Sequence, residues 1–109
     1  MQFRFSIRSL DPNVKLEIPD GEIAEGIMIR KPLSFKETVN PPVDFILYVA
    51  EHYALPVLAT LTASYLYDKL KDRKDKPIEI NNQVVEINAE NIEKQINIII
   101  NQSKNENED

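Results

Sequence analysis

The chain lacks cysteine altogether, and it has only two glycines and one histidine among its 109 residues. Without cysteine it has no disulfide, no thiolate metal ligand and no cysteine nucleophile, and this absence fits a reducing cytosol. The two glycines, Gly21 and Gly26, are too few and too isolated for a glycine-rich phosphate-binding loop. Several common classes of enzyme and cofactor-binding protein are therefore excluded.

The single histidine, His52, is predicted to be a helix-face or core residue. On a helix its neighbours Glu51 and Tyr53 point to other faces, so no acid–base pair forms around it. A metal site needs several converging ligands, and a pair such as Asp44 and Glu51 is too sparse to provide them. We predict no enzyme activity and no catalytic, cofactor-binding or metal-binding residue.

The charge balance and the N-terminal segment indicate which ligands and which cellular compartment to expect. The formal net charge is −5, which argues against nucleic-acid binding because clustered lysines and arginines supply most of that affinity. The first residues, MQFRFSIRSLDPN, contain neither an uninterrupted apolar stretch nor a small-residue cleavage site. We therefore expect no secretory signal and a cytoplasmic protein.

An apolar content of 42% over this length indicates a single globular domain. We place one α+β domain at residues 1–103 and a polar tail at residues 104–109. In QFRFSIRSL, Phe3, Phe5 and Ile7 alternate with polar residues, which predicts a strand with one buried face. The domain is expected to begin with antiparallel strands.

Turn residues divide the rest of the N-terminal region. Asp11–Asn13 predicts a turn that joins the first strand to a second at Val14–Ile18, as a β-hairpin. Another turn at Pro19–Glu22 precedes a third predicted strand in GIMIRK, residues 26–31. The segment Leu33–Pro42 ends in a double proline and is interpreted as a connection.

The segment VDFILYVAEHYALPVLATLTASYLYDKLKDR, Val43–Arg73, predicts one long apolar helix with a kink. Within residues 45–67 the only certainly charged side chain is that of Glu51. Pro56 removes the amide that would bond the carbonyl four residues earlier, so we expect a kink or break at residues 52–55. The same proline suits the first turn of a second helical piece.

Two interpretations of this predicted helix compete. Residues 45–67 are long enough to cross a bilayer, and the basic side chains that follow, from Lys69 to Lys76, would mark the cytoplasmic side. Against a membrane span, a carboxylate inside hydrocarbon costs about 2.5–3.5 kcal/mol. A central helix wrapped by a sheet is also apolar on most sides. The pattern favours the buried core helix.

The segment PIEINNQVVEINAENIEKQINIII, residues 77–100, predicts a tight hairpin followed by a short terminal helix. A turn at Asn81–Asn82 suits a residue type that tolerates positive φ, and it pairs Glu79 with Val84. A turn one residue later would set Glu79 opposite Glu86, which like-charge repulsion disfavours. The inward-facing residues of this hairpin are predicted to be Ile78, Ile80, Val85 and Ile87.

The closing helix has clear signals at its start and along one face. Asn88 is expected to cap it, with Glu90 in the first turn to complement the helix dipole. An apolar stripe at helical spacing predicts that one face packs on the sheet or on the long helix. The stripe comprises Ile92, Ile96, Ile99, Ile100 and Ser103.

The order of these elements resembles that of a known protein family. The segment YLYDKLKDRKDKPIEINNQVVEINAENIEKQI, Tyr65–Ile96, resembles the effector-associated constant component proteins of bacterial conflict systems. In that family the turn is usually Asp-Gly where this chain has Asn81–Asn82, and arginine commonly follows where this chain has Gln83. The resemblance implies a non-enzymatic adaptor encoded beside an effector, with no active site to carry over.

We therefore expect a small interaction or adaptor component that binds a protein partner or forms a homo-oligomer. Small residues at helical spacing let another backbone approach closely, within the chain or from a partner. A membrane anchor that uses residues 45–67 is the second hypothesis, and a small-ligand binder or enzyme is the third. No cofactor is expected. The candidate interface residues are Tyr48, Ala59, Ala63, Tyr65 and Tyr67.

Overall fold

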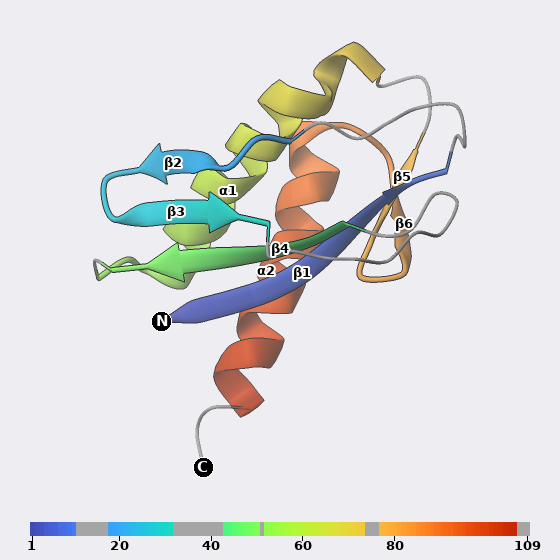
Figure 1. Cartoon of the computed structure of the whole chain (residues 1–109). Helices are drawn as coiled ribbons and strands as arrows, with labels where there is room; N and C mark the ends of the chain where they lie inside the picture. Colours follow the sequence, from blue (N-terminus) through green and yellow to red (C-terminus); the bar gives the residue numbers. More distant parts are fainter. Residues whose placement is uncertain (11–17, 32–42, 51, 74–76, 107–109) are drawn as a thin grey trace.

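The computed structural model describes residues 1–10, 18–31, 43–50, 52–73 and 77–106. These residues form one six-stranded antiparallel sheet and two α-helices, so the predicted α+β class is confirmed. Both helices lie behind the same face of the sheet (Figure 1). The elements in chain order are β1 (Gln2–Ser9), β2 (Gly21–Ala24), β3 (Ile27–Arg30), β4 (Val43–Val49), α1 (Leu55–Leu70), a 3₁₀ turn (Lys71–Arg73), β5 (Ile78–Ile80), β6 (Gln83–Val85) and α2 (Ala89–Glu106).

The sheet has the strand order β2-β3-β4-β1-β5-β6, which places the first strand near its centre. β1 pairs with β4 over residues 2–7 and with β5 over residues 7–9. The predicted partner strand at Val14–Ile18 lies outside the described residues, except for the buried Ile18, which belongs to no strand. Within the described residues, β1 therefore gains its partners from distant parts of the chain.

The prediction of one long helix over Val43–Arg73 is wrong for its first part. Residues 43–49 form the strand β4 between β3 and β1, and only residues 55–70 form the helix α1. Phe45, Leu47 and Val49 face the helices, while Ile46 on the other face is also buried. A central strand that is buried on both faces has a nearly continuous apolar sequence, which hides the two-residue period.

The start of the helix α1 is marked by a proline. Pro56 stands in its first turn, as predicted, where a missing amide costs no helical hydrogen bond. The Leu58 amide donates to the Ala54 carbonyl at 3.0 Å and closes that turn. Instead of kinking a long helix, the proline starts a shorter one. No helix within the described parts of the chain is long and apolar enough to cross a membrane.

The hairpin formed by β2 and β3 corrects a second prediction. Gly21 and Glu22, which were assigned to a turn, are the first residues of β2, whereas β3 lies within the predicted third strand. The turn is at Glu25–Gly26, where Gly26 has a φ of 78° that a residue with a Cβ atom rarely adopts. The Tyr53 hydroxyl donates to the Glu25 carbonyl and ties this turn to the start of α1.

The predicted turn and helix cap of the C-terminal region are confirmed. Asn81 and Asn82 have φ values of 50° and 68°, and Glu79 pairs with Val84. The Asn88 Oδ1 accepts a hydrogen bond from the Asn91 amide at 2.8 Å and caps α2. The hairpin joins the sheet through β5 and β1. α2 has 18 residues and α1 has 16, so the closing helix is not the short element that was predicted. It continues to Glu106, into the segment that was predicted to be a polar tail.

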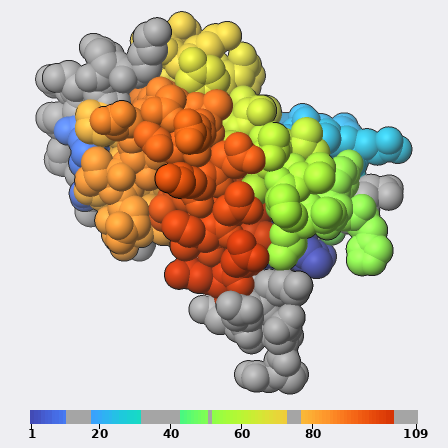
Figure 2. Space-filling model, turned by 180° about the vertical axis from the view of Figure 1, so that it is seen from behind, coloured from blue at the N-terminus to red at the C-terminus, as the bar shows by residue number. Residues whose placement is uncertain are grey.

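The core lies between the inner face of the sheet and the two helices. α1 and α2 pack side by side over this face, as the rear view in Figure 2 shows. The predicted stripe of α2 is buried at Ile92, Ile96, Ile99 and Ile100. Burying each such isoleucine contributes about 1.5–3 kcal/mol before entropic costs. Within the described residues, the helices and this face of the sheet hold the fold together.

Candidate functional site

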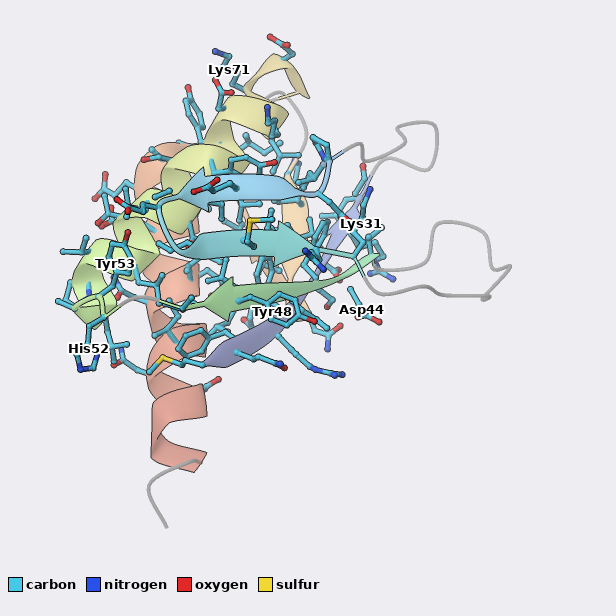
Figure 3. The ribbon with its side chains drawn as sticks, turned by 60° about the vertical axis from the view of Figure 1, so that its left-hand side comes forward. Lys31, Asp44, Tyr48, His52, Tyr53 and Lys71 are labelled. Atoms are coloured by element: carbon cyan, nitrogen blue, oxygen red, sulfur yellow. The ribbon has the colours of Figure 1, made fainter. Side chains whose placement is uncertain are left out.

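The sheet has one face that no described helix covers, and this outer face is the candidate site. Along β1, Phe3, Phe5 and Ile7 face the helices, whereas Arg4 and Ser6 face outward. Tyr48 of β4 also lies on the outer face, turned away from the helices (Figure 3). The alternation in β1 predicted a strand with one buried face, and the polar residues of the same alternation form part of this outer face.

An apolar residue flanked by two arginines forms the centre of the outer face. Ile46 stands opposite Arg4 on one side and Arg30 on the other, and it is only 6% exposed. The Arg30 guanidinium carbon lies 5.9 Å from the centre of the Tyr48 ring, within the range of a cation–π interaction. Long side chains such as arginine cover apolar surface with their stems while the charge stays in water.

We call this surface the outer patch. Its members are joined by cross-strand pairing, because Met28 stands opposite Tyr48, and Ile46 stands between the two arginines. Interfaces between proteins are enriched in arginine, tyrosine and methionine relative to other surfaces. The outer patch comprises Arg4, Met28, Arg30, Ile46 and Tyr48.

The arginines of the outer face differ in how their charges are balanced. Arg8 donates to the Glu79 carboxylate at 2.8 Å, a cross-strand ion pair between β1 and β5. Arg4 and Arg30 have no carboxylate within ion-pair distance among the described residues. The outer patch therefore presents two guanidinium groups that form no ion pair within the described residues, and the Asp44 carboxylate lies on the same face, diagonal to Arg4.

A shallow hollow of about 240 Å³ lies beside the outer patch, on the β1–β4 pair. Asn81, from the β5–β6 turn, closes one end of it, held by two hydrogen bonds with the Ser6 main chain. The charged residues that line it are Arg4 and Asp44. Its lining therefore lacks the pair of carboxylates that acid–base catalysis commonly uses. The hollow is lined by Arg4, Phe5, Ser6, Asp44, Phe45, Ile46 and Asn81.

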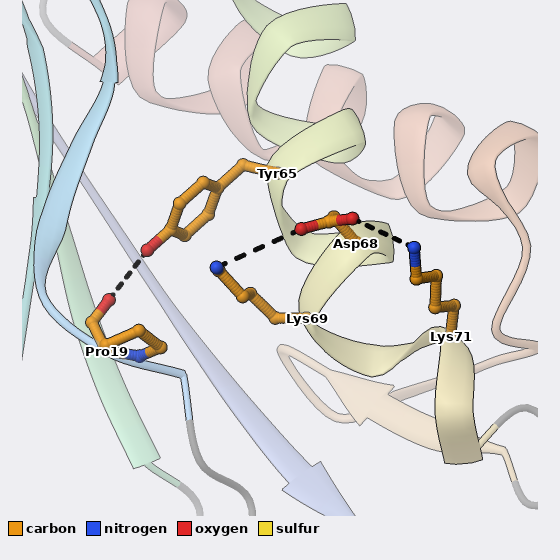
Figure 4. Close-up of polar contacts among 5 residues, drawn as sticks. All are labelled: Pro19, Tyr65, Asp68, Lys69 and Lys71. Atoms are coloured by element: carbon orange, nitrogen blue, oxygen red, sulfur yellow. Dashed lines mark hydrogen bonds and ion pairs between the residues drawn. The ribbon is translucent and has the colours of Figure 1, made fainter.

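A second polar cluster lies at the end of α1, away from the outer patch (Figure 4). The Tyr65 hydroxyl donates to the Pro19 carbonyl at 2.8 Å, and the Lys69 ammonium lies 5.3 Å from the centre of the Tyr65 ring. Burial, and then the nearby charge of Asp20, raise the pKa of the Tyr65 phenol. These contacts fasten α1 to the start of β2, which is a structural role.

Asp68 completes this cluster on the exposed side of the helix. Its carboxylate accepts from the Lys71 ammonium at 3.1 Å, while the Lys69 ammonium lies 3.9 Å away. The hydrogen bond with Asp68 is the main cause that raises the pKa of Lys71. An exposed lysine that is held protonated is no general base at neutral pH.

His52 was predicted on a helix face or in the core, and this prediction is wrong. The residue is exposed in the connection between β4 and α1, because the helix that would have contained it is not formed (Figure 3). Within the described ranges, no group of three or more histidine, cysteine, aspartate or glutamate side chains is placed to hold a metal ion.

The five candidate interface residues lie in separate environments. Tyr48 belongs to the outer patch, and Ala59 and Ala63 are buried in the core at 0% and 2% exposure. Tyr65 and Tyr67 are half-buried on α1, on the other layer of the domain. The structure therefore does not bring the five together as one surface. It adds Arg4, Arg30 and Ile46 to Tyr48, and the alternation in QFRFSIRS already pointed to the first of these.

Comparison with known proteins gives no relative from which function can be transferred. No protein-family model, no curated protein and no solved structure matches this chain. The function is therefore argued from the geometry of the outer face.

Proposed function

We propose that this chain is a non-enzymatic interaction domain, an adaptor component that binds a partner protein on the outer patch. The observation that carries the proposal is Ile46, nearly buried between two arginines that have no described carboxylate partner. Binding hot spots are built from arginine and tyrosine around a desolvated apolar centre. The outer patch has this composition in a small area of one sheet face.

The chemistry of the outer patch favours a partner with acidic groups. Carboxylates opposite Arg4 and Arg30 would form charge-assisted hydrogen bonds, and guanidinium groups can hold a carboxylate through two such bonds. Self-association through the same surface would bring guanidinium groups of like charge together. A different protein therefore fits the outer patch better than a second copy of this chain.

The resemblance of Tyr65–Ile96 suggests which class of partner this is. The residues that carry it form β5, β6, α2 and the end of α1, and β5 lies beside the strand that bears Arg4. We propose that the chain acts in the cytosol as an adaptor of a bacterial conflict system, and that its partner is an effector. The lack of cysteine supports the cytosolic setting.

Site-specific photo-crosslinking tests this function. A photoreactive phenylalanine analogue replaces Tyr48 in the cells that encode the chain, and the same analogue replaces Tyr67 as a matched control on α1. The proposal expects a discrete protein adduct from position 48, absent from position 67 and lost when Arg30→Glu is added. No adduct from position 48, or equal adducts from both positions, would contradict the proposal.

A further inference from the structure

The two edges of β1 are paired over different lengths. One edge pairs with β4 over residues 2–7. The other edge pairs with β5 only over residues 7–9, and the hairpin then turns back at Asn81. Residues 2–5 of β1 therefore have no strand partner on that second edge among the described residues, as Figure 1 allows the reader to follow. We call this segment, Gln2–Phe5, the open edge.

The hydrogen bonds at either end of the open edge show which groups are unpaired. Both main-chain groups of Met1 bond Val49 of β4, whereas both main-chain groups of Ser6 bond Asn81 on the opposite side. Because successive residues of a strand direct their main chain to alternate edges, Gln2 and Arg4 point the same way as Ser6. Their two amides and two carbonyls thus line the open edge without a hydrogen-bond partner among the described residues.

The open edge carries one charged side chain, that of Arg4, and it ends at Ser6. The Arg4 side chain lines the hollow beside it together with Asp44, and the Arg4 guanidinium lies beyond ion-pair distance of every described carboxylate. Asn81 lines the same hollow and stops the edge at Ser6. A four-residue strand is about 13 Å long, which is enough for two pairs of main-chain hydrogen bonds.

We propose that an extended acidic segment of another protein adds to the sheet along the open edge. Its main chain pairs with Gln2 and Arg4, and an acidic side chain on its outward face meets the Arg4 guanidinium. Strand addition of this kind gives affinity through the main chain and specificity through alternate side chains. The inference rests on the proposed function, because it names where and how the partner protein binds.

The charge decides between this occupant and a second copy of β1. In an antiparallel pair of two β1 strands, the two Arg4 side chains would lie on the same face as diagonal neighbours. Like charges directly opposite each other across two strands are destabilising, and diagonal neighbours remain within reach of long side chains such as arginine. An acidic segment places opposite charges there instead, and its attraction weakens as salt is added.

The test uses synthetic eight-residue peptides with the full-length protein. One peptide alternates valine with glutamate, a second alternates valine with lysine, and a third repeats the first with an N-methyl group on every residue, so that both edges of the peptide are blocked. Binding is followed by fluorescence anisotropy and by the amide signals of Gln2 and Arg4 in NMR spectra. The proposal expects the acidic peptide to bind about tenfold more tightly than the basic one and to shift both amide signals. N-methylation is expected to abolish these effects.

Variants at one position separate the main chain from the charge. Arg4→Ala keeps the amide, whereas Arg4→Pro removes an amide that points away from β4, which an edge strand tolerates. Arg4→Pro should bind the acidic peptide about fivefold more weakly than Arg4→Ala, because one charge-independent hydrogen bond is lost. Arg4→Glu should reverse the preference toward the basic peptide. Thermal unfolding of all three variants confirms that they remain folded.

The outcomes distinguish this inference from the proposed function. Peptide binding that shifts signals of Tyr48 and Met28 but is equal in Arg4→Ala and Arg4→Pro would overturn strand addition and leave the outer patch as the binding surface. No binding of any peptide, together with a photo-crosslink from position 48, would also overturn strand addition alone. Failure of both experiments would overturn both proposals.

Discussion

Asn81 and Ser6 are joined by two hydrogen bonds that dock the β5–β6 hairpin onto the central strand. The Ser6 amide donates to the Asn81 Oδ1 at 2.8 Å, and the Asn81 amide donates to the Ser6 carbonyl at 3.0 Å. Asn81 also has a φ of 50°, so one residue both makes the tight turn and ends the pairing of β1 with β5. The position of the open edge depends on this pair.

Replacing Asn81 separates its conformational role from its side-chain role. Asn81→Gly keeps the positive φ but loses the hydrogen bond from Ser6, and we expect the free energy of unfolding to fall by about 1 kcal/mol. Asn82→Gly is the matched control, because the second position of such turns favours glycine and it should leave stability equal or higher. Urea unfolding measures both, and an equal loss in the two variants would contradict the role of the side chain.

Thr62 is fully buried in α1, and its hydroxyl has no hydrogen-bond partner among the described residues. A buried polar group without a partner costs free energy, so Thr62→Val should raise the free energy of unfolding by about 1 kcal/mol. Thr60→Val is the matched control on the same helix. The Thr60 hydroxyl contacts the Pro56 carbonyl at 2.9 Å and the Glu93 carboxylate at 2.5 Å, so its loss should destabilise the protein.

Thermal and urea unfolding compare these two threonine variants directly. Opposite signs are expected from the same chemical change at positions two residues apart. A loss of stability in Thr62→Val equal to that in Thr60→Val would show that the buried hydroxyl is satisfied, and it would contradict this description of the core.

Tyr65 gives the protein a predictable response to alkaline pH. Its pKa is raised from 10.0 by burial and by Asp20, so the unfolded chain loses this proton at lower pH than the folded protein does. The stabilising effect of the neutral phenol is fully present below the unfolded pKa, and it is lost as the pH rises through the folded pKa. Tyr65→Phe should lower stability by about 1 kcal/mol at neutral pH through loss of the bond to Pro19.

The difference between wild type and Tyr65→Phe is measured by urea unfolding at about pH 8 and about pH 11, on either side of the usual tyrosine pKa. It should be smaller at the higher pH. Tyr67→Phe serves as the control, because the Tyr67 hydroxyl bonds no described residue. A difference that stays constant or grows with pH would contradict the assigned role of Tyr65.

The elements that were predicted well are those whose signals are local. The tight turn at Asn81–Asn82 depends on the backbone φ of these two residues, the Asn88 cap bonds a residue three positions on, and the isoleucines of α2 repeat at helical spacing. β4 was predicted as a helix because its apolar run continues toward α1 with only Glu51 and His52 between. Only its pairing with β1 and β3 makes it a strand, and those partners are distant in sequence.

The candidate site was predictable to a smaller extent. The alternation in β1 placed Arg4 on an outward face, but its neighbours Ile46 and Arg30 come from strands whose pairing no local pattern specifies. Tyr48 was identified for its type and was assigned to the wrong element. Ala59 and Ala63 were selected for small size, which serves packing in the core as well as it serves an interface.

The central claim is that the outer patch binds the partner, and one affinity comparison tests it most directly. The protein captured through position 48 is titrated calorimetrically with wild type, Tyr48→Ala and Tyr67→Ala. Truncation of a hot-spot aromatic residue should weaken binding by about tenfold or more, so we expect that loss for Tyr48→Ala and nearly unchanged affinity for Tyr67→Ala. Unchanged affinity for Tyr48→Ala, or a larger loss for Tyr67→Ala, would contradict the claim and move the binding surface to the helical layer.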